Sequence, residues 1–302
     1  MCGIVGYLEK TGDTADTIGR IVLGMLNALG CRGPDSAGVA LYGHSRDNEF
    51  VAQVALSGNH SFDASAAKVL EAAGKFAPVS DSSITDCYLR FQIGGQACIK
   101  CLIKAVESVE PGTEVVSLGR HLEIVKQVGS PENLEATYHV SKFEGTHGIG
   151  HTRLSTESRI DLSHSQPFWG HGYPDLAIAH NGHITNYHQL RRRYEQRGVR
   201  FYTENDSEII AIYLASQLSA GHTLEQAFCS MQSDLDGSFS CVVATDSQLG
   251  FVKDQFALKP LLYAETDAFV AIATEEIALR SALPGDYAVR EAQAKESRTW
   301  RK

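Results

Sequence analysis

The chain has 302 residues, of which 43% are hydrophobic and 21% charged, values typical of a globular protein with one large domain or two modest ones. Its formal net charge of −9 argues against nucleic acid or an anionic membrane as the main partner, because both reward a basic face. No apolar run approaches the ~18 residues of a membrane span, and the first residues lack the pattern of a secretory signal. We therefore expect a cytoplasmic location.

In chain order, residues 2–7 are predicted to form a buried strand, 16–29 a helix that stops at Gly30, and 36–42 a second strand. The segment from about 50 to 115 alternates helix (64–76, 98–109) and strand (85–93, 113–118), which predicts a small α/β insertion. Further strands are expected at 175–180, 237–246, 250–253, 261–264 and 268–274, and further helices at 187–196 and 206–218. Strands and helices thus come in blocks, which favours an α+β fold of stacked sheets with helices outside. Residues 1–283 are expected to form the domain, and 284–302 a polar tail.

Seven cysteines without regular spacing are expected to be reduced thiols. Cys98 and Cys101 form a single CxxC pair, and a metal site would normally need further ligands at matching spacing. We interpret them as two thiols packed on a helix. Eight histidines lie between His139 and His188, but none have the HExxH spacing. No metal site is predicted.

Cys2, followed by Gly3, is a candidate nucleophile. Removal of Met1 would leave Cys2 with a free α-amine, and such amines titrate near ~7.7–8.0. The amine could take the thiol proton and later return it to a leaving group. Taken alone, the sequence Met1-Cys2-Gly3 favours a buried N-terminal cysteine without catalytic function.

Four further segments strengthen the catalytic interpretation, because they follow Cys2 in a fixed order. They are RGPDSAG at 32–38, GHTR at 150–153, AHNG at 179–182 and ENDSE at 204–208. Together with Cys2 they resemble the class II (N-terminal nucleophile) glutamine amidotransferase domain found in glucosamine-6-phosphate synthase, amidophosphoribosyltransferase and glutamate synthase. The resemblance covers roughly residues 1–45 and 122–283, and it implies the αββα sandwich of Ntn hydrolases.

The resemblance also implies a role for each matching residue. Cys2 would attack the side-chain amide of glutamine, and the Asn181 amide and the Gly182 N–H would form the oxyanion hole. Arg153 would bind the substrate carboxylate and Asp206 its ammonium. The remaining implied residues are Thr156 in the substrate pocket, and Arg32 and Gly33 in the loop over the nucleophile.

Each residue also has a purely structural interpretation. Asn181-Gly182 is a common turn dipeptide, Asp206 could cap its helix, and Arg153 could form a surface ion pair. His151 and His180 are expected to pack or orient neighbours rather than to bind a metal.

The resemblance extends most closely to the stand-alone amidotransferase subunit of glutamate synthase-type complexes, with N-methylglutamate synthase as the suspected variant. The segments that carry it are residues 152–158, 165–167 (Ser-Gln-Pro) and 181–187. Only nineteen residues follow Leu283, so we expect the ammonia to be used by a separate synthase subunit. The expected hetero-oligomer contains an FMN-type synthase subunit and a β-helix subunit. FMN and an iron–sulfur cluster would belong to that partner, and no cofactor is expected in this chain.

Two other functions remain open. The chain could be a catalytically silent subunit that binds glutamate or glutamine and organises the complex. A retained Met1 would favour that function, because Cys2 would then have an amide nitrogen and no basic amine. The chain could also be part of an asparagine synthetase-type or phosphoribosyl-type enzyme.

Overall fold

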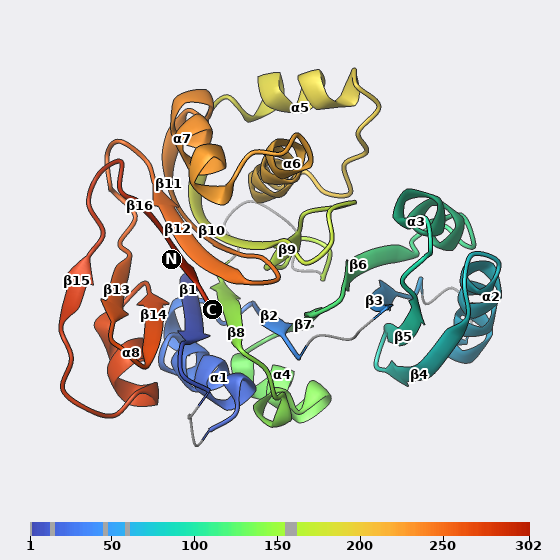
Figure 1. Cartoon of the computed structure of the whole chain (residues 1–302), viewed down its shortest axis with the longest axis horizontal. Helices are drawn as coiled ribbons and strands as arrows, with labels where there is room; N and C mark the ends of the chain where they lie inside the picture. The colour runs from blue at the N-terminus through green and yellow to red at the C-terminus, as the bar shows by residue number, and fades with distance from the viewer. Residues whose placement is uncertain (1, 13–15, 45–47, 58–60, 155–161) are drawn as a thin grey trace.

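Two antiparallel sheets form the centre of the molecule (Figure 1). The computed structural model describes residues 2–12, 16–44, 48–57, 61–154 and 162–302. The seven-stranded sheet has the spatial order β15 (Val289–Glu291), β13 (Leu262–Glu265), β14 (Phe269–Ala273), β1 (Gly3–Glu9), β8 (His147–Arg153), β2 (Ser36–Tyr42) and β7 (Leu122–Val128). The five-stranded sheet has the order β16 (Ser297–Arg301), β12 (Gln248–Lys253), β11 (Gly237–Ala244), β10 (Ala177–Ile184) and β9 (Phe168–Trp169).

Strand β1 shows why this chain forms stacked layers. Its side chains alternate between two cores: Ile4 and Leu8 lie between the sheets, whereas Val5 and Tyr7 face the helices outside. A strand that is buried on both faces must be apolar at every position, which explains the uninterrupted apolar run at the N-terminus.

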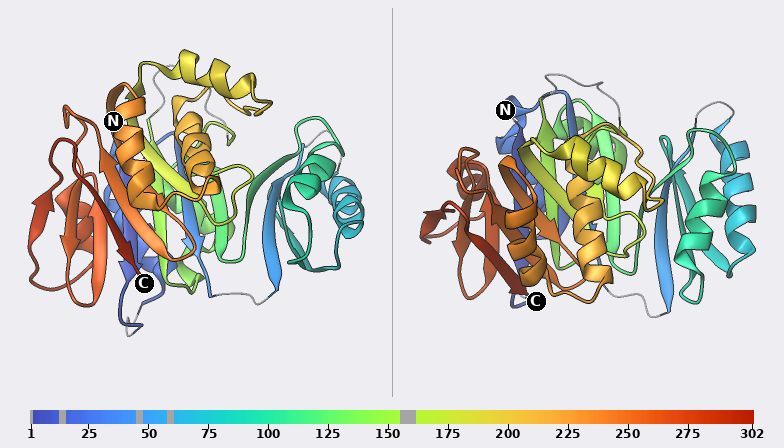
Figure 2. Two further views of the ribbon diagram at one scale, coloured as in Figure 1. Left: turned by 45° about the horizontal axis from the view of Figure 1, so that its top comes forward. Right: turned by 90° about the horizontal axis from the view of Figure 1, so that it is seen from above.

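Helices cover the outer face of each sheet (Figures 1 and 2). On the seven-stranded side they are α1 (Ile18–Ala28), α4 (Pro131–Tyr138) and α8 (Glu276–Ala282), with short 3-10 turns η1 (Gly30–Arg32) and η2 (Val140–Lys142). On the five-stranded side they are α5 (Tyr187–Glu195), α6 (Asp206–Ser219) and α7 (Leu224–Asp234). The resulting order of layers, helix–sheet–sheet–helix, confirms the expected α+β sandwich.

The segment expected to be an insertion forms a separate sheet beside the sandwich, seen at the right of Figure 1. Its strands lie in the order β4 (Val79–Thr85), β5 (Tyr88–Gly94), β3 (Glu49–Ala55) and β6 (Glu114–Gly119), with helices α2 (Phe62–Gly74) and α3 (Ile99–Glu107) packed on it. Glu107, at the end of α3, connects this unit to the sandwich. Its carboxylate accepts a hydrogen bond from the Tyr202 hydroxyl at 2.8 Å and lies 3.3 Å from His171 Nε2.

The expected polar tail is wrong for much of 284–302. Residues of β15 pair with β13, and residues of β16 pair with β12, so both segments are edge strands. Trp300 is buried, with its ring 5.8 Å from that of Phe251 and 5.9 Å from that of Tyr263. An edge strand with one solvent-facing side can be largely polar. Because β15 and β16 lack an apolar run, the sequence did not predict either of them as a strand.

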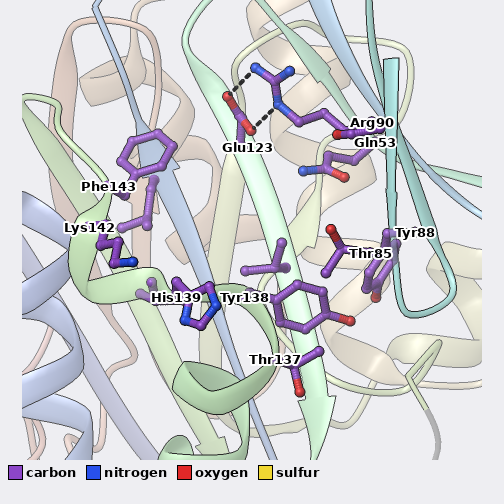
Figure 3. Close-up of a pocket in the computed structure, with 14 residues that line it drawn as sticks. Gln53, Thr85, Tyr88, Arg90, Glu123, Thr137, Tyr138, His139, Lys142 and Phe143 are labelled. Atoms are coloured by element: carbon purple, nitrogen blue, oxygen red, sulfur yellow. Dashed lines mark hydrogen bonds and ion pairs between the residues drawn. The ribbon is translucent and has the colours of Figure 1, made fainter. Parts of the chain in front are cut away.

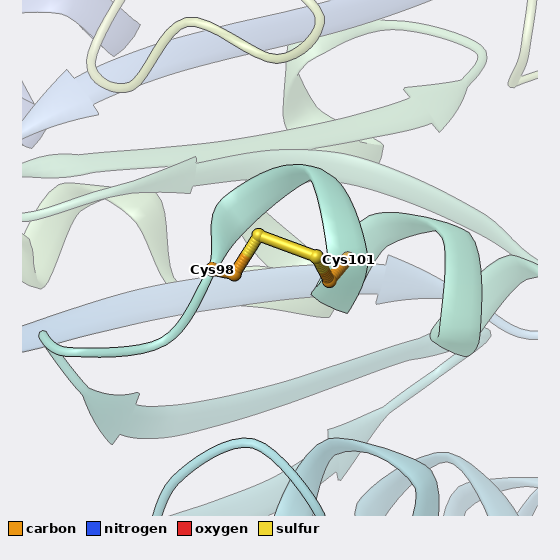
Figure 4. Close-up of a disulfide and its surroundings, with 2 residues drawn as sticks. All are labelled: Cys98 and Cys101. Atoms are coloured by element: carbon orange, nitrogen blue, oxygen red, sulfur yellow. A yellow bond between two sulfur atoms is a disulfide. The ribbon is translucent and has the colours of Figure 1, made fainter.

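The cysteine pair also differs from expectation, since Cys98 and Cys101 form a disulfide instead of two free thiols (Figure 4). Cys98 is the N-cap of α3 and Cys101 lies in its first turn, with 5.3 Å between their Cα atoms. Residues three apart at a helix start are neighbours in space, which makes the pairing geometrically accessible.

Other differences concern element boundaries. The single strand expected at 85–93 is the second half of a hairpin, because β4 precedes it and the chain turns at Asp86. Helices α4, α7 and α8 were not predicted.

Within the described residues, no helix combines the length and apolar character needed to cross a bilayer.

Candidate active site

Five of the residues singled out by the sequence line one cavity of about 640 Å³. They are Cys2, Arg153, Asn181, Gly182 and Asp206. The topology explains this convergence. Strands β1 and β8 are antiparallel neighbours, so the start of one meets the end of the other. Strand β10 of the facing sheet contacts both, and brings Asn181 and Gly182 to the same end.

Cys2 is held by its main chain while its sulfur lines the cavity. Its carbonyl oxygen accepts hydrogen bonds from Asn181 Nδ2 at 2.9 Å and from Arg32 Nε at 3.4 Å. The Leu154 N–H points at Cys2 Sγ with a nitrogen–sulfur distance of 3.4 Å. A peptide N–H in this position would support negative charge on the sulfur during attack. The hydrogen bonds to its main chain therefore fix the position of Cys2, while its sulfur stays accessible from the cavity.

Arg32 and Gly33 brace this arrangement from outside the cavity. Arg32, which bonds the Cys2 carbonyl, also forms an ion pair with Glu275. Gly33 passes so close to β8 that an added Cβ would lie 2.5 Å from the backbone nitrogen of Arg153. Only glycine permits this approach, which places the loop directly against the strand end.

Gly182 presents its N–H to the edge of β10 that faces away from β11. In the antiparallel register Gly182 lies opposite Phe239, whose own N–H and carbonyl are both bonded to Asp254, at 2.8 and 3.1 Å. The pair is therefore of the non-hydrogen-bonded kind, and the Gly182 N–H points the other way. The residue has φ of +145°, and an added Cβ would lie 2.1 Å from the Ser238 carbonyl oxygen.

The two neighbouring N–H groups on this open edge are occupied. That of His180 donates to Gln166 Oε1 at 2.6 Å, and that of Ile184 donates to Asp206 Oδ2 at 2.8 Å. Between them the Gly182 N–H has no partner among the described residues, at a residue that lines the cavity. An N–H left open at a cavity wall is what an oxyanion site requires.

Asp206 does not cap α6. Asn205 is the N-cap, with Oδ1 accepting from the Ser207 N–H at 2.9 Å. The Asp206 carboxylate instead turns toward β10, where it accepts from Ile184 and lies 3.6 Å from His183 Nδ1. The purely structural interpretation of Asp206 as a cap is therefore wrong, and its charge borders the cavity.

Gln166 was not identified as a site residue from sequence. Its Nε2 donates to the His180 carbonyl at 2.9 Å and to Ser207 Oγ at 3.1 Å, while its Oε1 accepts from the His180 N–H. The buried carboxamide thus makes the two hydrogen bonds with the His180 backbone that a neighbouring strand would otherwise make. The Ser-Gln-Pro segment at 165–167 was the only available signal, and it does not indicate such a contact. The Leu154 N–H was missed because a backbone donor leaves no trace in residue type.

Two histidines near the cavity, His151 and His180, are buried. Burial lowers the pKa of His151 to about 3, and burial also lowers the pKa of His180. His180 Nδ1 lies 2.8 Å from Ser207 Oγ. Across the part of the chain that the structure describes, no three His, Cys, Asp or Glu side chains cluster as metal ligands. Thr156, the remaining predicted site residue, lies outside the described residues.

Comparison with known proteins agrees with this geometry. Residues 151–281 match the family model of the glutamine amidotransferase domain. The chain is 36% identical over 292 residues to a protein of Methanothermobacter thermautotrophicus assigned to the glutamine amidotransferases, covering 94% of each chain. It is 35% identical over 279 residues to the glutamine amidotransferase-like protein GlxB of Rhizobium meliloti, covering 92% of this chain and 91% of GlxB.

Among solved structures, the glutamine phosphoribosylpyrophosphate amidotransferase of B. subtilis, complexed with ADP and GMP, superposes with a TM-score of 0.63 at 19% identity. The match covers 99% of this chain and 49% of that enzyme, so this chain corresponds to about half of it. The fold is that of the Ntn-hydrolase amidotransferases. With its full-length similarity to the relatives above, the chain belongs to the glutamine amidotransferase family, class II.

Proposed function

We propose that this chain hydrolyses L-glutamine to L-glutamate and ammonia through a thioester on Cys2. The observation that carries the proposal is the single cavity lined by a thiol, an open backbone N–H, an amide, a guanidinium and a carboxylate. Acyl transfer needs the thiol as nucleophile and the N–H and amide as oxyanion donors. Recognition of an amino acid needs the guanidinium for its carboxylate and the carboxylate for its ammonium.

The chemistry can be written for this chain's own groups. The α-amine of Cys2, freed by loss of Met1, takes the thiol proton, and the sulfur attacks the side-chain carbonyl carbon of glutamine. The oxyanion that forms is stabilised by the Gly182 N–H and by the Asn181 Nδ2 hydrogen that is not bonded to Cys2. The ammonium of Cys2 then protonates the departing nitrogen, which leaves as ammonia. Water, activated by the same amine, hydrolyses the thioester to glutamate.

Substrate selection is assigned to two charges. Arg153 is only 6% exposed at the end of β8, and its planar guanidinium suits a bidentate bond to the substrate carboxylate. Asp206, with a side chain 18% exposed, would take the substrate ammonium. A bare amide would leave both charges without their ligand partner, so the site would discriminate strongly against it.

We further propose that the ammonia serves a separate synthase in a glutamate synthase-like hetero-oligomer. N-methylglutamate synthase, which would convert methylamine and glutamate to N-methylglutamate and ammonia, is the specific variant. Support comes from the likeness of residues 152–158 and 165–167 to such subunits, and from full-length similarity to GlxB, itself named as amidotransferase-like. FMN and an iron–sulfur cluster would be held by the partner.

Ammonia release tests the glutaminase proposal directly. The wild-type chain and Cys31→Ala, which changes an exposed thiol elsewhere, should release ammonia from glutamine, whereas Cys2→Ala should not. Equal activity in Cys2→Ala would contradict the proposal. If the wild type is inactive alone and also when co-purified with an FMN-type synthase subunit, the silent binding subunit becomes the better account.

A further inference from the structure

A second cavity, of about 500 Å³, opens where the insertion meets the outer face of the seven-stranded sheet (Figure 3). Strands β3, β4 and β5 of the insertion form one wall, the segment from α4 to η2 forms the opposite wall, and β2 and β7 lie between them. No residue lines both this cavity and the candidate active site. Its volume lies in the range of pockets that bind small molecules.

Gln53 is the observation that points to a ligand. Its side chain is 4% exposed, lies on β3 and points into this cavity (Figure 3). Its carboxamide makes no hydrogen bond to any described residue, and its polar atoms are open to the cavity. A group from a ligand would satisfy both the donor and the acceptor of this amide.

Tyr88, on the same wall as Gln53, is a second largely buried side chain whose polar group has no partner in the described part of the chain. It is 2% exposed, and its ring packs 5.8 Å from that of Tyr138. Its hydroxyl, like the Gln53 amide, finds no partner in the described part of the chain, while the Tyr138 hydroxyl is bonded to Asp86 at 3.3 Å. Two largely buried side chains whose polar ends face the cavity without a protein partner favour a polar ligand over a purely apolar one.

Charged side chains lie on two sides of the cavity. Arg90 pairs with Glu123 through two hydrogen bonds, of 2.8 and 3.2 Å, and also with Asp81 at 2.8 Å, so this cluster holds two carboxylates and one guanidinium. Lys142, on the opposite wall beside His139, makes no ion pair with any described residue. A carboxylate at this side of the cavity would meet a cation that has no ion-pair partner within the described part of the protein.

The floor between the two walls is apolar. Leu41 of β2 is buried and lines the cavity with Val125 of β7 and Phe143. Such a floor would accommodate an aliphatic chain. The cavity therefore presents a cation at one side, an apolar floor, and hydrogen-bonding groups at the other side.

We propose that this cavity binds a small aliphatic monocarboxylate whose far end carries a hydrogen-bonding group. The carboxylate meets Lys142, the chain lies on Leu41 and Val125, and the far end pairs with Gln53 and Tyr88. The site joins the insertion to the sandwich, so the bound ligand stabilises the folded form in which these two units are in contact.

Calorimetric titration of the full chain with 5-hydroxypentanoate tests the proposal, with pentane-1,5-diol as the uncharged control. The wild type should bind the acid saturably at one site and bind the diol more weakly. Lys142→Met and Gln53→Leu should each raise Kd at least about tenfold. Lys75→Met, which changes an exposed lysine outside the cavity, should not alter Kd. Retention of affinity in both Cys2→Ala and Arg153→Lys would separate this site from the candidate active site.

Two results would overturn the proposal: no saturable binding of the acid by the wild type, or unchanged affinity in both cavity variants. Thermal unfolding supplies an independent check that requires no ligand. Because the Gln53 amide makes no hydrogen bond within the described protein, Gln53→Leu should leave the Tm of the free protein unchanged or higher. A clearly lower Tm would mean that the amide has a partner within the protein, and would contradict the proposed role.

Discussion

Asn181 Nδ2 donates a hydrogen bond to the main-chain oxygen of Cys2 across 2.9 Å, although 179 residues separate them in the chain. One of the two amide hydrogens thereby orients the nucleophile. The other remains for an oxyanion on the substrate. The same side chain would thus position the thiol and stabilise the transition state, and its removal should affect kcat more than substrate affinity.

Asn181→Ala is expected to lower kcat for glutamine hydrolysis by about 10²–10³-fold, the usual effect of losing one oxyanion donor. KM should change little, because the donor acts mainly on charge that develops in the transition state. Steady-state kinetics of ammonia release measure both parameters. A large rise in KM with kcat unchanged would instead place Asn181 in ground-state binding.

Arg153→Lys is expected to raise KM strongly with a smaller loss in kcat. A point charge replaces a planar fork, so the substrate and the transition state lose the same contact. The comparison of KM with kcat for glutamine is the readout. A loss confined to kcat would contradict the assignment of Arg153 to the substrate carboxylate.

Gly182→Ala and Gly221→Ala form a matched pair, since both glycines have positive φ. An alanine Cβ at Gly182 would lie 2.1 Å from a carbonyl oxygen, whereas at Gly221 it would meet nothing within 4 Å. Gly221→Ala should cost about 1–2 kcal/mol from backbone strain alone. Gly182→Ala should cost about 2–6 kcal/mol, because strain and overpacking add, and should also abolish activity. Urea unfolding measures the difference, and equal costs would refute the close approach to β11.

Acid sensitivity should follow from two buried, neutral histidines. Burial lowers the pKa of His147 to about 4 and that of His151 to about 3, whereas an unfolded imidazole titrates near ~6.5. Below pH ~6.5 the unfolded chain therefore binds protons that the native state does not. The free energy of unfolding should fall by about 1.4 kcal/mol per pH unit for each histidine, until the native pKa is reached.

His151→Leu separates this contribution from that of the carboxylates. Its free energy of unfolding should fall less steeply between pH 6 and pH 4.5 than that of the wild type, by the slope of one histidine. Urea midpoints at several pH values in this range provide the measurement. Parallel curves for the two proteins would show that His151 is not held neutral by the fold.

The disulfide predicts a thiol count. In denaturant without reductant, five thiols should react with Ellman's reagent, and after reduction all seven should react. Cys98→Ser should leave one additional thiol, that of Cys101. Seven reactive thiols in freshly purified, unreduced protein would favour the reduced pair expected from sequence.

Local patterns predicted those parts of the fold that have a local cause. The apolar run at 2–7 and the helical spacing at 16–29 are visible because both elements bury most of their residues. Strand β16 and helix α7 were missed because each is polar on its solvent face, and only tertiary packing identifies the buried face. The pairing of Cys98 with Cys101 was missed because spacing alone cannot distinguish two thiols from a disulfide.

The candidate site could be predicted only as far as side-chain type and order allow. Cys2, Arg153 and Asn181 were expected to share a site because the motifs that contain them resemble those of the amidotransferase family, and all three line one cavity. The direction of the Gly182 N–H depends on the register between β10 and β11, and that register is a property of two segments far apart in the chain. The same applies to Gln166, whose amide contacts a strand that begins eleven residues later.

The central claim is that Cys2, with its α-amine free, is the nucleophile. Intact mass spectrometry, before and after treatment with a diazoketone analogue of glutamine, tests it most directly. We predict a native mass that lacks Met1 and a gain of one analogue per chain, located on Cys2 by peptide mapping and absent from Cys2→Ala. A mass that retains Met1, with no adduct on Cys2 or with the adduct on Cys31 or another thiol, would contradict the account.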